Sequence, residues 1–145
     1  MENKYRYAVI GAGNGGKAMA AYLALLGAQV TLYNRTANRV EIIRLRGGID
    51  LENPSEPNGF GRLHKVTDNM EEALNEADII MVVVPSTAHA DIAKAAAQYL
   101  RDDHIVVLNP GRTGGALEFR FTLEQEHCPT KPIIAEAETF LFASR

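Results

Sequence analysis

The sequence is short of several residue types, and each shortage excludes a class of protein. Its 145 residues contain one cysteine and no tryptophan. The lone Cys128 excludes an internal disulfide and a CxxC redox pair, so we expect a structural thiol in a cytoplasmic protein. The formal net charge is −3 and no basic run is present. Neither nucleic acid nor an anionic membrane is therefore an expected partner.

Long apolar stretches are also missing. No segment approaches the roughly 20 apolar residues of a membrane-spanning helix, and the N-terminus lacks the apolar core of a signal peptide. The histidines have no His, Cys, Asp or Glu neighbours at a spacing typical of metal ligands, so we expect no metal. Hydrophobic residues make up 46% and charged residues 23%. This composition and length predict one globular domain with a core of its own.

Apolar runs and amphipathic segments alternate along the chain. Apolar runs predict strands at 5–10, 29–33, 78–85 and 104–111, with one or two more after 132. Helical spacing predicts helices between 16 and 27, between 38 and 47, and at about 70–77, 88–100 and 115–125. The glycine- and proline-rich residues 47–62 predict a hairpin or loop excursion. The alternation predicts an α/β fold, a doubly wound parallel sheet (Rossmann fold) in three layers α/β/α, with strand order 3-2-1-4-5-6.

Two helices carry recognisable start signals. Thr36 or Asn38 is predicted to cap the second helix, whose inward apolar residues include Leu45. Asn69 and Glu72 fit a capping box that begins the third helix.

A glycine fingerprint, "GAGNGG", follows the first predicted strand and opens a helix. Gly11 permits a tight turn, Gly13 lets the backbone approach a pyrophosphate, and Gly16 lets the helix pack near the strand. The free N–H groups at the helix N-terminus favour phosphate. The fingerprint predicts a dinucleotide site. The alternatives are a glycine-rich turn that binds nothing and a flavin site.

The acid expected at the end of the second strand is absent. That acid would accept hydrogen bonds from the adenosine ribose, but Asn34, Arg35 and Thr36 stand there. Arginine suits a 2′-phosphate, and Arg39 lies one turn further on. We therefore expect NADP to be favoured over NAD. A solvated arginine, or one that stacks on the adenine of NAD, remains the alternative.

Four segments together resemble the opine dehydrogenases, the octopine and nopaline dehydrogenase relatives. They are "GAGNGGKAMAAYLALLGAQVTLYNR", "ADIIMVVVPSTAHADIA", "LNPGRTGGALEF" and "ETFLFASR". The resemblance implies reductive condensation of an amino acid with a 2-oxo acid using NAD(P)H. It also implies that residues 1–145 are the dinucleotide-binding domain, and that the catalytic C-terminal domain of the family is absent. No catalytic residue is assigned, and the isolated chain is expected to be inactive. A homodimer is left open.

The resemblance gives roles to the loops that follow the strands predicted at 78–85 and 104–111. Residues 84–87 are expected beside the pyrophosphate and nicotinamide ribose, and His89 either contacts the cofactor or caps its own helix. Arg112 and Thr113 are expected to face nicotinamide or a substrate carboxylate. Gly114 and Gly115 are expected to leave helix N–H groups free for an anion. The closing motif offers Glu138, Thr139 and Arg145, the last as a contact for a substrate carboxylate.

The predicted cofactor site draws on four loops. Its residues are Gly11, Gly13, Asn14, Gly15, Gly16, Asn34, Arg35, Thr36, Val84, Pro85, Ser86, Thr87, His89, Asn109, Pro110 and Gly111. Two other functions fit a similar domain. One is the N-terminal domain of a ketopantoate reductase, 6-phosphogluconate dehydrogenase or glycerol-3-phosphate dehydrogenase, and the other is a non-catalytic nucleotide-binding module.

Overall fold

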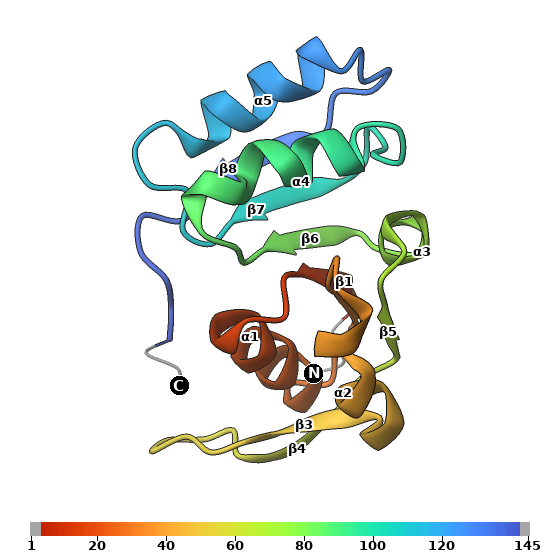
Figure 1. Cartoon of the computed structure of the whole chain (residues 1–145). Helices are drawn as coiled ribbons and strands as arrows, with labels where there is room; N and C mark the ends of the chain where they lie inside the picture. Colours follow the sequence, from red (N-terminus) through yellow and green to blue (C-terminus); the bar gives the residue numbers. More distant parts are fainter. Residues whose placement is uncertain (1–3, 143–145) are drawn as a thin grey trace.

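Six strands form one parallel sheet with helices on both sides (Figure 1). The computed structural model describes residues 4–142. The sheet order is β5-β2-β1-β6-β7-β8, and every neighbouring pair is parallel. Its strands are β1 (Arg6–Ile10), β2 (Gln29–Tyr33), β5 (Lys65–Thr67), β6 (Ile79–Val82), β7 (Ile105–Leu108) and β8 (Ile133–Glu136). Because β5 is the third of these in chain order, the predicted order 3-2-1-4-5-6 is confirmed.

The helices divide between the two faces of the sheet. They are α1 (Asn14–Leu25), α2 (Glu41–Arg46), α3 (Met70–Asn75), α4 (His89–Ala96) and α5 (Gly115–Gln125), with the one-turn helices η1 (Ala37–Arg39) and η2 (Ser86–Ala88). One core cluster lies beneath α1 and α2, and the other beneath α3, α4 and α5. Figure 1 shows α4 and α5 side by side, across the sheet from α1. Within residues 4–142, no helix has the length and apolarity to cross a membrane.

Alternation along the strands divides the core between these two faces. In β1, Ile10 points to the α4 side and Val9 to the α1 side, and both are fully buried. In β7, Leu108 likewise packs beneath α4 and α5. The side of β8 that faces the α1 layer is less completely covered. Ile133 on that side is 61% exposed. Burial on both faces explains why the central strands read as continuous apolar runs.

A separate hairpin interrupts the βα alternation, as predicted for residues 47–62. It consists of antiparallel β3 (Gly48–Leu51) and β4 (Gly59–Arg62). The hairpin packs on α1 so closely that a Cβ at Gly61 would lie 2.7 Å from the carbonyl oxygen of Ala21. The following strand β5 was not predicted, because three residues are too few to show a period.

The helix caps follow the prediction in one place and depart from it in another. Asn69 Oδ1 accepts from the N–H of Glu72 at 3.2 Å, so the Asn69 cap is confirmed. The return bond of the predicted capping box is not formed, because the N–H of Asn69 donates to Thr67 Oγ1 at 3.0 Å, and Thr67 Oγ1 in turn donates to Glu72 Oε2 at 2.8 Å. Neither Thr36 nor Asn38 caps α2, because η1 intervenes and Val40 takes the cap position without a side-chain hydrogen bond. Leu45 is 80% exposed rather than inward.

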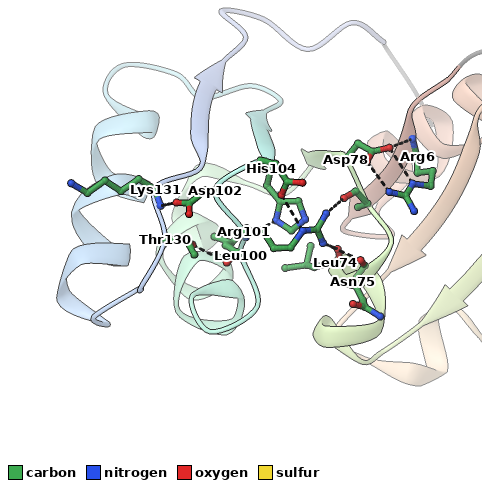
Figure 2. Close-up of polar contacts among 12 residues, drawn as sticks. Arg6, Leu74, Asn75, Asp78, Leu100, Arg101, Asp102, His104, Thr130 and Lys131 are labelled. Atoms are coloured by element: carbon green, nitrogen blue, oxygen red, sulfur yellow. Dashed lines mark hydrogen bonds and ion pairs between the residues drawn. The ribbon is translucent and has the colours of Figure 1, made fainter.

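Polar contacts at the amino ends of the strands join the end of α3 to the loop before β7. Figure 2 shows the guanidinium of Arg101 directed at the end of α3. It donates to the carbonyl oxygens of Asn75 and Ala77, each at 2.9 Å. The backbone N–H of Arg101 donates to His104 Nδ1 at 3.0 Å. A cation at the helix C-terminus also complements the helix dipole.

An ion pair between β1 and the start of β6 lies at the same edge (Figure 2). Arg6 donates to Asp78 through its backbone N–H, Nε and Nη2, at 2.9, 3.1 and 2.9 Å. The hydrogen bonds from Arg6 lower the pKa of Asp78 from 3.8 to about 2. Because the folded-state pKa is depressed, the pair stabilises the fold above about pH 4. This contribution is lost as the pH falls toward 2.

We predict that Asp78→Asn lowers the free energy of unfolding at pH 7 by no more than about 1 kcal/mol, because both side chains are partly exposed. The gap from wild type should close as the pH falls from about 4 toward 2. Urea unfolding of both proteins across this pH range measures it. A gap that stays constant would contradict the assigned pKa.

Candidate functional site

The candidate site lies at the carboxyl ends of the strands, where the strand order reverses. The chain leaves β1 for β2 on one side, and β6 pairs with β1 on the other. In open parallel sheets the crevice at this point binds ligands. The loops after β1, β2, β6 and β7 all meet there, and they carry the predicted site residues.

Two glycines of the fingerprint let β1 turn into α1. Gly11 has φ +111°, and its N–H donates to the carbonyl oxygen of Tyr33 at 2.9 Å. A Cβ at Gly11 would lie 2.3 Å from the carbonyl oxygen of Val83, and a Cβ at Gly16 would lie 1.7 Å from that of Gly11. Any side chain at these two positions would push the loop apart.

Gly13 differs from its neighbours because the space beside it is open. A Cβ there would meet nothing within 4 Å. The residue occupies the N-cap position of α1 without a side-chain cap, and Asn14 begins the helix. The space next to Gly13 thus adjoins the N-terminus of a 12-residue helix, where the helix dipole favours phosphate.

Asn34 connects the end of β2 to the glycine loop. Its Oδ1 accepts from the N–H of Ala12 at 3.2 Å, and its Nδ2 donates to the carbonyl oxygen of Thr36 at 3.0 Å. A carboxylate has no hydrogen to donate to that carbonyl. The residue that replaces the expected acid therefore braces the loop.

A first cleft of about 320 Å³ lies between the end of β2 and α4. It is lined by Gly11, Tyr33, Asn34, Arg35, Thr36, Arg39, Val84, Pro85, Ala88, Asp91, Ile92 and Ala95. Six of these residues belong to the predicted site, which the fold brings together from three loops. Burial raises the pKa of Tyr33, so its phenol stays neutral.

Sequence reasoning missed the α4 wall of this cleft. Ala88, Asp91, Ile92 and Ala95 recur at spacings of three and four residues, which places them along one side of a helix. That spacing is visible in the sequence. Only the topology could show that this side of α4 faces β2.

A second cleft of about 480 Å³ lies between the N-termini of α4 and α5. It is lined by Ser86, Thr87, His89, Gly111, Arg112, Thr113, Gly114, Gly115 and Glu118. Ser86, Thr87, His89 and Gly111 belong to the predicted site, and Arg112 and Thr113 were expected beside them. The loop after β6 separates the two clefts. Its residues 84–85 line the first cleft, and its residues 86–87 line the second.

The helix N–H groups expected to be free for an anion are partly occupied. Glu136 Oε2 accepts from the N–H of Ala116 at 2.7 Å. The same carboxylate lies close to Gly111, where a Cβ would come within 2.7 Å of Oε2. The expectation of an open anion site at Gly114 and Gly115 was therefore wrong in this respect. A protein carboxylate from β8 already lies at this N-terminus.

Several predicted residues lie apart from both clefts. Asn109 is buried, and its Nδ2 donates to the carbonyl oxygen of Val107 at 2.8 Å. Pro110 and Gly16 line neither cleft. A Cβ at Gly15 would lie 2.9 Å from the ring of Phe140, so this glycine contacts the closing segment. Arg145 lies outside the described residues.

His89 does not cap its helix. It is the first residue of α4 and fully buried, and neither ring nitrogen has a hydrogen-bond partner among residues 4–142. Burial lowers the pKa of His89, opposed by Glu118 and Glu136. Leaving a buried polar group unpaired typically costs about 1–3 kcal/mol. Among the described residues, no cluster of His, Cys, Asp or Glu could hold a metal ion.

Comparison with known proteins agrees with this geometry. Residues 6–111 match the family described as NAD-dependent glycerol-3-phosphate dehydrogenase N-terminus. The chain belongs to this family. It is also 42% identical over 139 residues to opine dehydrogenase from Arthrobacter sp. (strain 1C), covering 96% of this chain and 38% of that relative. It corresponds to the N-terminal NAD(P)-binding region of an opine dehydrogenase-like oxidoreductase.

Solved structures with the same fold include two dehydrogenases. Octopine dehydrogenase in complex with NADH and agmatine superposes with a TM-score of 0.79 at 23% identity, covering 97% of this chain and 36% of that one. Yersinopine dehydrogenase with NADP+ bound superposes with a TM-score of 0.67 at 18% identity, covering 85% of this chain and 32% of that one. Solved structures with this fold thus include one with NADH and one with NADP+. This chain spans about a third of the length of the relatives it matches.

We predict that Gly13→Val abolishes measurable dinucleotide binding while the domain stays folded. The added side chain enters the open space at the helix N-terminus, where its Cβ meets no atom within 4 Å. Stability should therefore fall by no more than about 1 kcal/mol, the typical cost of an unfavourable N-cap residue. Titration calorimetry and a thermal melt measure the two effects.

Gly16→Ala is the matched control, because its Cβ would collide with the carbonyl oxygen of Gly11. That variant should lose stability as well as binding. If Gly13→Val bound the dinucleotide with unchanged affinity, the phosphate site would have to lie elsewhere.

Proposed function

We propose that this chain binds NADP(H) in preference to NAD(H). The observation that carries the preference is Arg35, which lines the first cleft together with Arg39 at the end of β2. Two arginines and one carboxylate, Asp91, line that cleft, so the charge facing a ligand is positive. A 2′-phosphate on the adenosine ribose is the group that this charge suits best.

We further propose that the domain serves a reductive condensation. An amino acid and a 2-oxo acid would form an imine, which NAD(P)H then reduces. The support is the 42% identity to an opine dehydrogenase, which extends beyond the glycine fingerprint to 96% of this chain. The protein's share of such chemistry is to orient the nicotinamide and to exclude side reactions. Arg112 and Thr113, in the second cleft, are proposed to face nicotinamide or a substrate carboxylate.

The catalytic acid and base are proposed to lie outside residues 1–145. The relatives are more than twice as long as this chain, and the resemblance places those groups in a C-terminal domain. Residues 1–145 then act as the dinucleotide-binding domain.

A second candidate is glycerol-3-phosphate dehydrogenase activity, which the description of the matching family model supports. It uses the same cofactor site and differs in substrate. Dihydroxyacetone phosphate, offered to a full-length relative of this chain with NADPH, tests it against an amino acid with pyruvate.

We predict that the chain holds NADPH more tightly than NADH, and that Arg35→Asp inverts the order. A hydrogen bond to a charged group is worth about 1.5–3 kcal/mol, so the variant should weaken NADPH by roughly one to two orders of magnitude. NADH should change little. The NADPH preference should shrink as salt is raised, because the contact is partly exposed. Dissociation constants at low and high salt measure this.

The control is Arg62→Asp, which makes the same charge change at an exposed position on β4. It should leave both affinities nearly unchanged. If Arg35 only stacked on adenine, Arg35→Asp would weaken NADPH and NADH equally, and the proposed NADP preference would fail.

We predict that residues 1–145 bind the cofactor without opine synthesis. General acid–base catalysis needs a group within reach of the reacting atoms, and the proposed site assigns none in this chain. NADPH absorbance, followed with pyruvate and a panel of amino acids, measures turnover. Steady oxidation that depends on both substrates would contradict the prediction and indicate an active site in this chain or its dimer.

A further inference from the structure

Gly15 is a glycine that the fingerprint does not require. In G-x-G-x-x-G the specified positions are Gly11, Gly13 and Gly16, and the residues between them are free to vary. Gly15 is the second residue of α1, where glycine is less favourable than almost any other residue. A Cβ there would lie 2.9 Å from Cε1 and 3.0 Å from Cζ of Phe140. The ring of Phe140 therefore fills the space that a side chain at this position would need.

Phe140 belongs to the closing segment, residues 137–142, which crosses from β8 to α1. Figure 1 shows the chain leaving β8 and running toward the α1 layer. At the start of the segment, the carbonyl oxygen of Ala137 accepts from the N–H of Gly111 at 3.0 Å. At its end, Phe140 and Phe142 pack against the core cluster beneath α1. The closing segment thus joins the loop after β7 to the first turn of α1.

Three aromatic rings hold the closing segment on α1. The ring centroid of Phe142 lies 5.2 Å from that of Tyr22, on α1, and 5.6 Å from that of Phe140, which it meets edge-on. Both distances lie in the range that favours aromatic pairs. Val83, in the loop after β6, reaches the same place, because its Cγ1 would lie 3.3 Å from a Cβ at Gly15. Phe140 therefore has a fixed position between α1 and its neighbouring ring.

The ring of Phe140 contacts α1 at the N–H groups proposed to bind phosphate. The N–H groups of residues 14–16 have no acceptor in a preceding turn, and Lys17 is the first to donate within the helix, to the carbonyl oxygen of Gly13 at 2.9 Å. Because residues two apart do not share a helix face, the contact at Gly15 lies on a different side of the turn from the open space at Gly13. The ring supports the first turn without occupying the space that a phosphate would take.

We propose, resting on the function proposed above, that Phe140 is a positioning residue for the phosphate-binding turn, and that the closing segment and the dinucleotide stabilise each other. The ring holds the first turn of α1 in the direction at which its N–H groups meet the pyrophosphate. A turn held in this way binds more tightly, because it loses less freedom on binding. Coupling between two sites is reciprocal. Bound dinucleotide therefore holds the closing segment on α1.

A double-mutant cycle on Gly15 and Phe140 tests the coupling, with NADPH affinity measured by titration calorimetry. Phe140→Ala should weaken NADPH about five- to tenfold, the lower end of typical couplings between sites. Gly15→Ala should weaken NADPH to a similar extent, because the new Cβ displaces the ring. In the Phe140→Ala background, Gly15→Ala should cause no further loss, because no ring remains to be displaced. Losses that simply add would mean that the two residues act independently, and would overturn the inference.

A shorter ligand and a neighbouring variant separate positioning from folding. 2′-AMP carries adenosine and the 2′-phosphate but no 5′-phosphate, so it reaches the first cleft without using the phosphate-binding turn. Its affinity should be the same in wild type and in every variant. Phe142→Ala removes the adjacent ring, which is not among the atoms nearest to Gly15. This variant should lower the melting temperature with a smaller loss of NADPH affinity than Phe140→Ala.

Amide hydrogen exchange of residues 138–142 measures the reciprocal effect. In wild type, saturating NADPH should slow this exchange by about the same five- to tenfold factor, and 2′-AMP should not slow it. In Phe140→Ala, NADPH should leave the exchange unchanged. Equal slowing in wild type and Phe140→Ala would mean that the ligand contacts the segment directly, and would contradict coupling through Phe140.

The outcomes separate this inference from the function on which it rests. Failure of wild type to bind either NADPH or NADH would overturn the function proposed above. Unchanged NADPH affinity in Phe140→Ala would overturn only the positioning role of Phe140. An equal loss of NADPH and 2′-AMP affinity would do the same, because it would mean a general loss of structure.

Discussion

The close approach of α1 to the end of β1 is the constraint on which the site depends. A Cβ at Gly16 would lie 1.7 Å from the carbonyl oxygen of Gly11, so only glycine allows the helix to begin there. This contact aims the N-terminus of α1 at the crevice. It also brings Gly11 beside Tyr33 and Val83, which ties the loop to the strands on either side of β1. One backbone contact thus fixes where α1 begins relative to the end of β1.

Asn34 braces the glycine loop in place of the acid expected at the end of β2. The amide satisfies the N–H of Ala12 and the carbonyl oxygen of Thr36, and it removes a negative charge from the first cleft. Arg35 can then face a phosphate without a neighbouring carboxylate at the strand end. In the proposed function, the same three residues thus fix the local geometry and favour the charge of the cofactor.

Sequence patterns predicted the longer helices and strands, together with the glycine and cap residues at their ends. The central strands, α1 and the Asn69 cap follow from apolar runs, glycine spacing and cap chemistry. The patterns did not reveal β5, which is three residues long, or the bond from Glu136 to the start of α5. Both depend on contacts between segments distant in the chain. The α4 wall of the first cleft was missed for the same reason. The sequence does not show which element one side of a helix faces until the sheet order is known.

The two edges of the sheet differ in their polar contacts. At the amino ends of the strands, Arg101 donates to the end of α3 and to the loop that follows it, and Arg6 pairs with Asp78. At the carboxyl ends, the space at Gly13 is open and His89 is buried with unpaired nitrogens. A buried polar group without a partner destabilises a fold. Unpaired buried nitrogens occur at both edges, because His104 Nε2 at the amino edge also has no partner among the described residues. The carboxyl edge differs in the open space beside Gly13 at the N-terminus of α1.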